Sequence, residues 1–92
     1  MKMLEEVRFL FTMDVDGKLR RQTAQDPETP LSLLLILATE DDWKIRLAVA
    51  KNDRTPKATV KTLAEDTDAR VRVAAKCHLE ATETVGNNLY FV

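Results

Sequence analysis

Apolar residues in the middle of the chain recur every three or four positions, the spacing that places side chains on one face of an α-helix. The spacing predicts helices from Pro30 to Thr39, from Trp43 to Lys51, from Pro56 to Glu65, and from Ala69 to Cys77 or His78. Two glycines and three prolines supply too few turn residues for a chain of many short strands. We therefore predict an all-α fold made of short helices.

These helical segments belong to a tandem repeat with a period of 26 residues. The features that recur at this offset are Thr-Pro at 29–30 and 55–56, Leu-Ala at 37–38 and 63–64, an aspartate at 42 and 68, and Ile-Arg or Val-Arg at 45–46 and 71–72. We expect a single domain, residues 1–92, with units at about 3–28, 29–54 and 55–80 and a C-terminal cap or partial unit at 81–92. The first unit is the most degenerate.

Each unit is predicted to hold two helices joined by an acidic turn. The hydroxyls of Thr29 and Thr55 are expected to accept a hydrogen bond from the first turn of the helix that follows, where proline costs no backbone donor. Asp42 and Asp68 stand where an aspartate caps the second helix.

Positions that are apolar in both copies are expected to form the core. They are Leu34 and Val60, Leu37 and Leu63, Ala38 and Ala64, Ile45 and Val71, Ala48 and Ala74, and Val49 and Ala75. The alanines among them favour close approach of the helices. Because one unit of this length buries too little surface to fold alone, the units are expected to stack as an α-α superhelix.

The strings TPLSLLLILATEDDWKIRLAVAKNDR and TPKATVKTLAEDTDARVRVAAKC resemble the leucine-rich repeat variant family, a relative in architecture of HEAT and armadillo repeats. The resemblance implies a right-handed superhelix that serves as a binding scaffold. Some members carry an iron-sulfur cluster on several cysteines, but this chain has only Cys77, so no cofactor is expected. The partner does not follow from the fold.

An acid precedes an arginine by four residues in each unit, at Asp16 and Arg20, Asp42 and Arg46, and Asp68 and Arg72. The spacing favours ion pairs on one helix face, with the acid near the helix N-terminus. Capping together with a ladder of ion pairs between turns is one interpretation. A row of ligand-binding arginines is the other.

Two surfaces are candidates for binding. Leu31 and Leu35 occupy the places of Lys57 and Lys61, and Trp43 replaces an alanine, which predicts an apolar contact site for another protein or a second copy of the chain. Alternatively, the N-terminal unit or the C-terminal tail covers these residues.

Basic residues outnumber acidic ones nine to four between residues 44 and 76, although the net charge of the whole chain is −1. Four of these basic residues form a possible anion-binding face on the second helices: Lys44, Lys51, Arg70 and Lys76. Binding of nucleic acid through phosphate contacts is therefore the alternative function. A solvated helical face is the plainer interpretation.

Catalytic and metal chemistry find little support. Neighbours on a helix point in different directions, so Cys77 and His78 do not form a nucleophile and base, and together they are too few for a zinc site. Residues 14–17 lack the later acids of a calcium loop and are predicted to form a turn. We expect a non-enzymatic module without metal or cofactor.

Three remaining observations concern the ends of the chain and its location. Residues 7–13 are also compatible with a strand of a hairpin, and residues 88–91 resemble part of a tag-cleavage site. A single cysteine, the lack of a leading signal stretch and the shortness of the longest apolar run, residues 33–38, predict a cytoplasmic protein that does not enter the membrane.

Overall fold

The described part of the chain consists of helices joined by short turns. A computed structural model describes residue 14 and residues 16–87, with side chains as far as residue 81. Its helices are α2 (Lys18–Gln25), α3 (Leu31–Leu37), α4 (Trp43–Lys51), α5 (Lys57–Leu63) and α6 (Ala69–Asn87). Within these residues there is no strand, so the all-α prediction is confirmed there. The strand alternative for residues 7–13 lies outside them.

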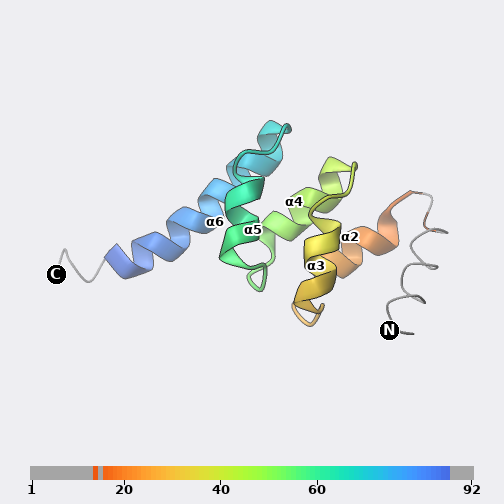
Figure 1. The fold of residues 1–92 in the computed structure, drawn as a ribbon, viewed down its shortest axis with the longest axis horizontal. Coiled ribbons are helices and arrows are strands. Elements are labelled where there is room, and N and C mark those ends of the chain that lie inside the picture. The colour runs from red at the N-terminus through yellow and green to blue at the C-terminus, as the bar shows by residue number, and fades with distance from the viewer. Residues whose placement is uncertain (1–13, 15, 88–92) are drawn as a thin grey trace.

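The helices form two layers in an elongated molecule. In Figure 1, α2, α4 and α6 follow one another across the view, and α3 and α5 cross in front of them. The molecule measures 51 × 27 × 17 Å, and its radius of gyration is 14.4 Å. A compact chain of this length would have a radius of gyration of about 12 Å. The described part of the chain is therefore more extended than a compact domain of this length.

The core lies between the two layers and was predicted well from the apolar pattern. Leu34, Leu37, Ile45, Val49 and Val60 are fully or almost fully buried, as are Leu63, Val71 and Ala75. The smaller Ala38, Ala64 and Ala74 are partly buried and pack against this cluster. Ala24 and Ala50, at equivalent places on α2 and α4, are buried without having been predicted. Their small side chains allow α2, α4 and α6, the helices of one layer, to approach one another.

The two Thr-Pro turns have the same geometry, but the threonines do not cap as predicted. Pro30 and Pro56 immediately precede α3 and α5, with φ −57° and ψ 144° and 143°, and neither helix start receives a side-chain cap. The hydroxyls of Thr29 and Thr55 instead donate to the carbonyl oxygens of Thr23 and Val49, at 2.6 and 2.7 Å. Both threonines are buried, so the hydroxyl satisfies a carbonyl at the end of the preceding helix.

The last aspartate of each acidic turn caps the following helix, as predicted. The Asp42 carboxylate accepts a hydrogen bond from the Lys44 amide at 2.9 Å, and the Asp68 carboxylate accepts one from the Arg70 amide at 2.8 Å. Each caps the helix that follows. The turn expected at residues 14–17 is also present, closed by the Gly17 amide on the Asp14 carbonyl oxygen. Gly17 has a φ of 75°, a conformation that favours glycine.

Helix ends differ from the predictions in two ways. Helices α3 and α5 end at Leu37 and Leu63, two residues earlier than expected. The last helix was expected to end at Cys77 or His78, which is wrong, because α6 continues to Asn87. The chain has His-Leu-Glu-Ala-Thr at 78–82, where the preceding unit has the turn sequence Asn-Asp-Arg-Thr-Pro at 52–56. Without asparagine or proline at these places, nothing ends the helix.

Candidate functional site: a groove and an arginine ladder

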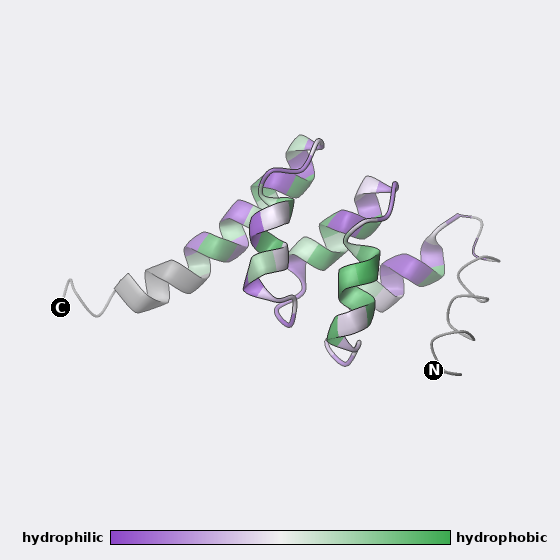
Figure 2. Cartoon of the chain, in the orientation of Figure 1, coloured by the Kyte–Doolittle hydropathy of each residue, from purple (hydrophilic) through white to green (hydrophobic). Residues whose placement is uncertain are grey.

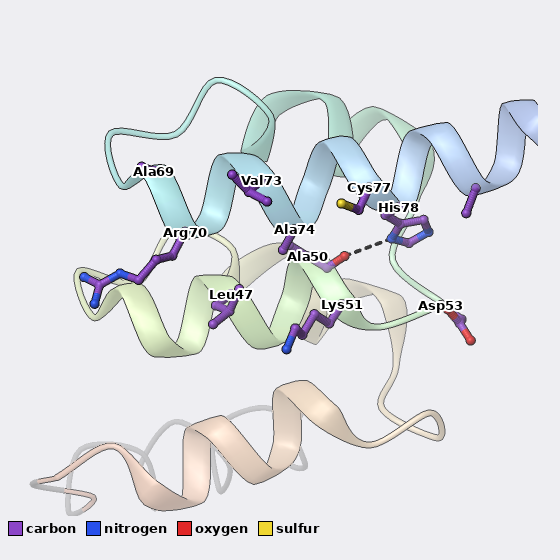
Figure 3. Close-up of a pocket in the computed structure, with 11 residues that line it drawn as sticks. Leu47, Ala50, Lys51, Asp53, Ala69, Arg70, Val73, Ala74, Cys77 and His78 are labelled. Carbon is purple, nitrogen blue, oxygen red and sulfur yellow. Dashed lines mark hydrogen bonds between the residues drawn. The ribbon is translucent and has the colours of Figure 1, made fainter.

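An open groove of about 980 Å³ runs between α4 and α6. Figure 3 shows its lining side chains, which come from one face of α4 and the facing side of α6. The apolar part of the lining consists of Leu47, Ala50, Ala69, Val73, Ala74 and Ala81. Val73 is 60% exposed, the largest exposed fraction among the large apolar side chains described. A binding partner that covers Val73 would remove this apolar surface from water.

Charged side chains stand at the edges of the same groove. Lys51 and Arg70 line it, with Asp53 at the end of α4. Cys77 also lines it and is an exposed free thiol. The groove therefore combines an apolar floor with charged edges.

A second, smaller hollow of about 160 Å³ lies between α2 and α4. Its lining from α4 includes Lys44, Leu47, Ala48 and Lys51. Addition of 26 to these numbers gives Arg70, Val73, Ala74 and Cys77, all of which line the larger groove. The smaller hollow therefore lies at the junction of α2 and α4, and the larger groove lies at the equivalent junction of α4 and α6.

Trp43 and Arg70 form a stacked pair at one end of the groove. The guanidinium carbon of Arg70 lies 3.4 Å from the centroid of the Trp43 ring. Asp68 accepts hydrogen bonds from Nε and Nη2 of the same guanidinium, at 3.1 and 2.8 Å. The Arg70 side chain, together with the backbone amides at the start of α6, lowers the pKa of Asp68 from 3.8 to about 2. Arg70 is therefore held between a ring and a carboxylate.

The predicted anion-binding residues are all exposed, and no single hollow is lined by all four. Lys51 and Arg70 line the larger groove, Lys44 lines the smaller hollow with Lys51, and Lys76 lines neither. The charge of Arg70 is balanced by Asp68. The four residues are therefore not gathered in one hollow.

Leu31, Leu35 and Trp43 lie on two different layers of the molecule. Leu31 and Leu35 on α3 are 44% and 47% exposed, and Ile36 beside them is 41% exposed. Figure 2 shows α3 as the most apolar helix of the front layer, in contrast to α5. Trp43 is half-buried on α4 and packs against the core. The apolar contact group predicted from the sequence is therefore divided.

Arginines link successive acidic turns, although not through the predicted partners. Nη1 of Arg20 donates to Glu40 at 2.9 Å, and Nε and Nη2 of Arg46 donate to the two carboxylate oxygens of Asp66 at 2.8 and 3.1 Å. Each acid lies 20 residues after its arginine. The pairs expected at a spacing of four, such as Asp42 with Arg46, do not form among the described residues. Those aspartates bind backbone amides instead, and Asp68 also binds the Arg70 guanidinium.

The Arg46–Asp66 pair is largely removed from water. The exposed fractions of the two side chains are 13% and 9%. Burial alone would raise the pKa of Asp66, but hydrogen bonds from Arg46 and from the Asp68 amide outweigh this effect and hold the pKa below 3.8. The hydrogen bond to Asp66 raises the pKa of Arg46. Both groups therefore remain charged at neutral pH.

The buried Asn52 connects the C-terminal end of α4 to the C-terminal end of α2. The Asn52 side-chain amide donates to the carbonyl oxygens of Ala24 and Asp26, at 2.8 and 3.1 Å. His78 takes the equivalent place on α6, where its Nδ1 lies 2.9 Å from the carbonyl oxygen of Ala50. A carbonyl oxygen only accepts, so Nδ1 carries the proton in this contact. This role was not recognised in the sequence, although the asparagine and the histidine align at the 26-residue offset.

Catalytic constellations are not found in the part of the chain that the structure describes. No group of three or more potential metal ligands occurs among these residues. His78 and Cys77 both line the groove, but the histidine Nδ1 is engaged with Ala50. Among the described helices, none is long and apolar enough to cross a membrane.

Comparison with known proteins gives no relative. No protein-family model matches the chain, and no curated protein or solved structure is significantly similar to it.

Proposed function

We propose that the chain is a non-enzymatic binding module for another protein, and that the groove between α4 and α6 holds an amphipathic segment of that partner. The open groove with its exposed Val73 is the observation that supports this function. Surfaces that combine an apolar centre with a polar edge are typical of binding sites for helical or extended segments.

The module is proposed to be a superhelix of 26-residue repeats, similar to the leucine-rich repeat variant family. The matched Thr-Pro turns, the hydroxyl contacts of Thr29 and Thr55 and the paired hollows support this architecture, since each recurs at the same offset. Its elongated shape also fits a stack in which each unit contacts only its neighbours.

The charged side chains beside the groove support a partner segment with acidic residues. Lys51 lines both hollows and Lys44 lines the smaller one, and no carboxylate pairs with either lysine in the described part of the chain. A segment with apolar side chains toward Leu47 and Val73 and acidic side chains toward these lysines fits the groove.

Nucleic-acid binding through the same face is the weaker candidate. Arg70, one of the basic residues that line the groove, already has a carboxylate partner in Asp68 at 2.8 Å. Each N-capping aspartate also lies two residues before a basic side chain, as Asp42 does before Lys44. A continuous phosphate backbone would have to pass these carboxylates, whereas a peptide can place a single acidic side chain at Lys51, away from them.

Selection of binders from a displayed library of random peptides tests the proposal. Because Cys77 is the only cysteine and lines the groove, its rate of alkylation reports occupation. We expect the selected peptides to be apolar and acidic, and to slow alkylation of Cys77. Val73→Glu should weaken their binding by about tenfold or more, because it places a charge on the apolar floor.

Thr62→Glu on the exposed side of α5 is the matched control and should leave peptide binding unchanged. The proposal is wrong if the peptides bind Val73→Glu as tightly as the unaltered chain, if they leave Cys77 equally reactive, or if the selection yields no binders. Retention on DNA that falls steeply with salt would instead support the nucleic-acid alternative.

A further inference from the structure

Arg20, Arg46 and Arg72 recur every 26 residues, and the last of them has no carboxylate partner among the described residues. The three arginines stand at equivalent positions of the three units. Asp14 and Glu40 bind the first of them, and Asp66 binds the second. No salt bridge joins Arg72 to a carboxylate in the described part of the chain.

Arg72 is nevertheless fixed in the same way as Arg46. Nη1 of Arg46 donates to the carbonyl oxygens of Glu40 and Asp41, at 2.6 and 2.8 Å. Nη1 of Arg72 donates to the equivalent carbonyl oxygens of Asp66 and Thr67, at 2.8 and 3.1 Å. The turn thus orients the guanidinium before any ligand arrives.

The edge that remains is the one that binds a carboxylate in the preceding unit. In Arg46 this edge, Nε and Nη2, takes both oxygens of Asp66. In Arg72 neither nitrogen has a hydrogen-bond partner in the part of the chain that the structure describes, and the side chain is partly exposed. A planar, oriented guanidinium edge favours two parallel hydrogen bonds to a carboxylate.

We infer that Arg72 is a docking site for a carboxylate that a partner protein supplies, in the position that Asp66 occupies beside Arg46. The acidic side chain of the partner takes Nε and Nη2, and the partner lies against the turn that leads into α6. Because the guanidinium is already held by two carbonyls, little conformational freedom is lost on binding. This contact is separate from the groove between α4 and α6, which Arg72 does not line.

Nuclear magnetic resonance of arginine side chains tests whether this edge binds carboxylates. Sodium acetate is titrated into the chain labelled with ¹⁵N-arginine, with sodium chloride of equal ionic strength as the reference. The Nε–H signal of Arg72 should shift with saturation, whereas that of Arg46 should not move because Asp66 occupies it. Arg54, exposed and without the two-carbonyl anchor, is the control. Equal responses of Arg72 and Arg54 would overturn the inference.

Peptide display tests whether the carboxylate comes from a protein. Binders selected on the unaltered chain, with removal of those that also bind Arg72→Lys, should contain an aspartate or glutamate. Replacement of that acid by its amide should weaken binding to the unaltered chain by about tenfold, and the unreplaced peptide should bind Arg72→Lys at least tenfold more weakly than the unaltered chain, because lysine keeps the charge but not the paired donors.

Peptides without an essential acid would overturn the inference, as would a response to acetate with no selected peptide, which would indicate a site for small anions only. The acetate titration uses the unaltered chain and therefore stands even if Arg72→Lys folds poorly. Val73→Glu separates the two proposals, since it should reduce binding in the groove and leave the response of Arg72 to acetate intact.

Discussion

At the scale of single residues, Arg46 joins two turns that are far apart in the sequence. Its guanidinium binds the carbonyls of its own turn and the carboxylate of Asp66 in the next. We expect Arg46→Gln to lower the free energy of unfolding by about 2 kcal/mol, because a largely buried carboxylate loses its charged partner. Urea denaturation measures this loss.

Arg54→Gln is the control for that measurement. Arg54 is exposed, and its single contact, to the carbonyl oxygen of Pro27, is 3.5 Å long. The control should change the free energy of unfolding by no more than about 0.5 kcal/mol. Equal free energies of unfolding for the two variants would show that the Arg46–Asp66 ion pair does not stabilise the fold.

Ionisation of Asp68 makes the free energy of unfolding depend on pH. Its pKa is about 2 in the folded chain and 3.8 when unperturbed, so folding favours the ionised form. The stabilising contribution is complete above the unfolded value and disappears as the pH falls from about 4 through about 2. Because the hydrogen bond from Arg70 is the main cause, Arg70→Gln should move the pKa of Asp68 toward 3.8. The carboxyl carbon shift of Asp68 against pH tests this, and an unchanged midpoint would exclude Arg70 as the cause.

Local residue roles were more readily predicted than distant ones. The cap made by Asp42 follows from its place immediately before an apolar-periodic segment. The partner of Arg46 did not follow, because spacing along one helix suggested Asp42, whereas packing of neighbouring turns brings Asp66 to it. Thr29 was assigned to the wrong end of its turn for the same reason, since the carbonyl it binds becomes available only in the folded unit.

At the scale of helices, α3 and α5 have the same bounds within the repeat but different outer surfaces. Leu31 and Leu35 on α3 are exposed where α5 carries Lys57 and Lys61. We expect the double variant Leu31→Lys, Leu35→Lys to fold with a free energy of unfolding within about 0.5 kcal/mol of the unaltered chain, since both side chains already contact water. Urea denaturation with light scattering measures stability and self-association together.

Leu34→Lys is the matched variant on the inner side of the same helix. Leu34 is fully buried, so a lysine there has to enter the core or disrupt it. This variant should be unfolded or severely destabilised. A large loss of stability in the outer double variant would mean that part of the protein covers Leu31 and Leu35, as the alternative interpretation of the sequence holds.

The presence of the helices could be predicted from the spacing of apolar residues, whereas the groove between α4 and α6 could not. The unpredicted length of α6 carries the helix past His78 to Ala81, which lines the groove beside α4. The exposure of Val73 depends on how α4 and α6 sit together, which a single sequence does not specify. Leu31 and Trp43 are both apolar exceptions within their units, yet the two-layer arrangement separates them.

At the scale of the whole molecule, stability is expected to come from contacts between neighbouring units. Asn52 links α4 to the end of α2, and His78 links α6 to the end of α4. Contacts of this kind allow a unit to be added wherever its two neighbours present matching surfaces. The binding proposals depend on this architecture, because both the groove and the free edge of Arg72 are defined by comparison with the preceding unit.

Insertion of a second copy of residues 29–54 directly after Arg54 tests the repeat architecture most directly. The longer chain should be helical, unfold in one cooperative transition at a higher temperature, and lengthen by about 10 Å, the separation of packed helices. Circular dichroism and X-ray scattering measure these properties, with an insert of the same residues in shuffled order as the control. Loss of cooperative unfolding, or no greater tolerance of the ordered insert than of the shuffled one, would contradict the account.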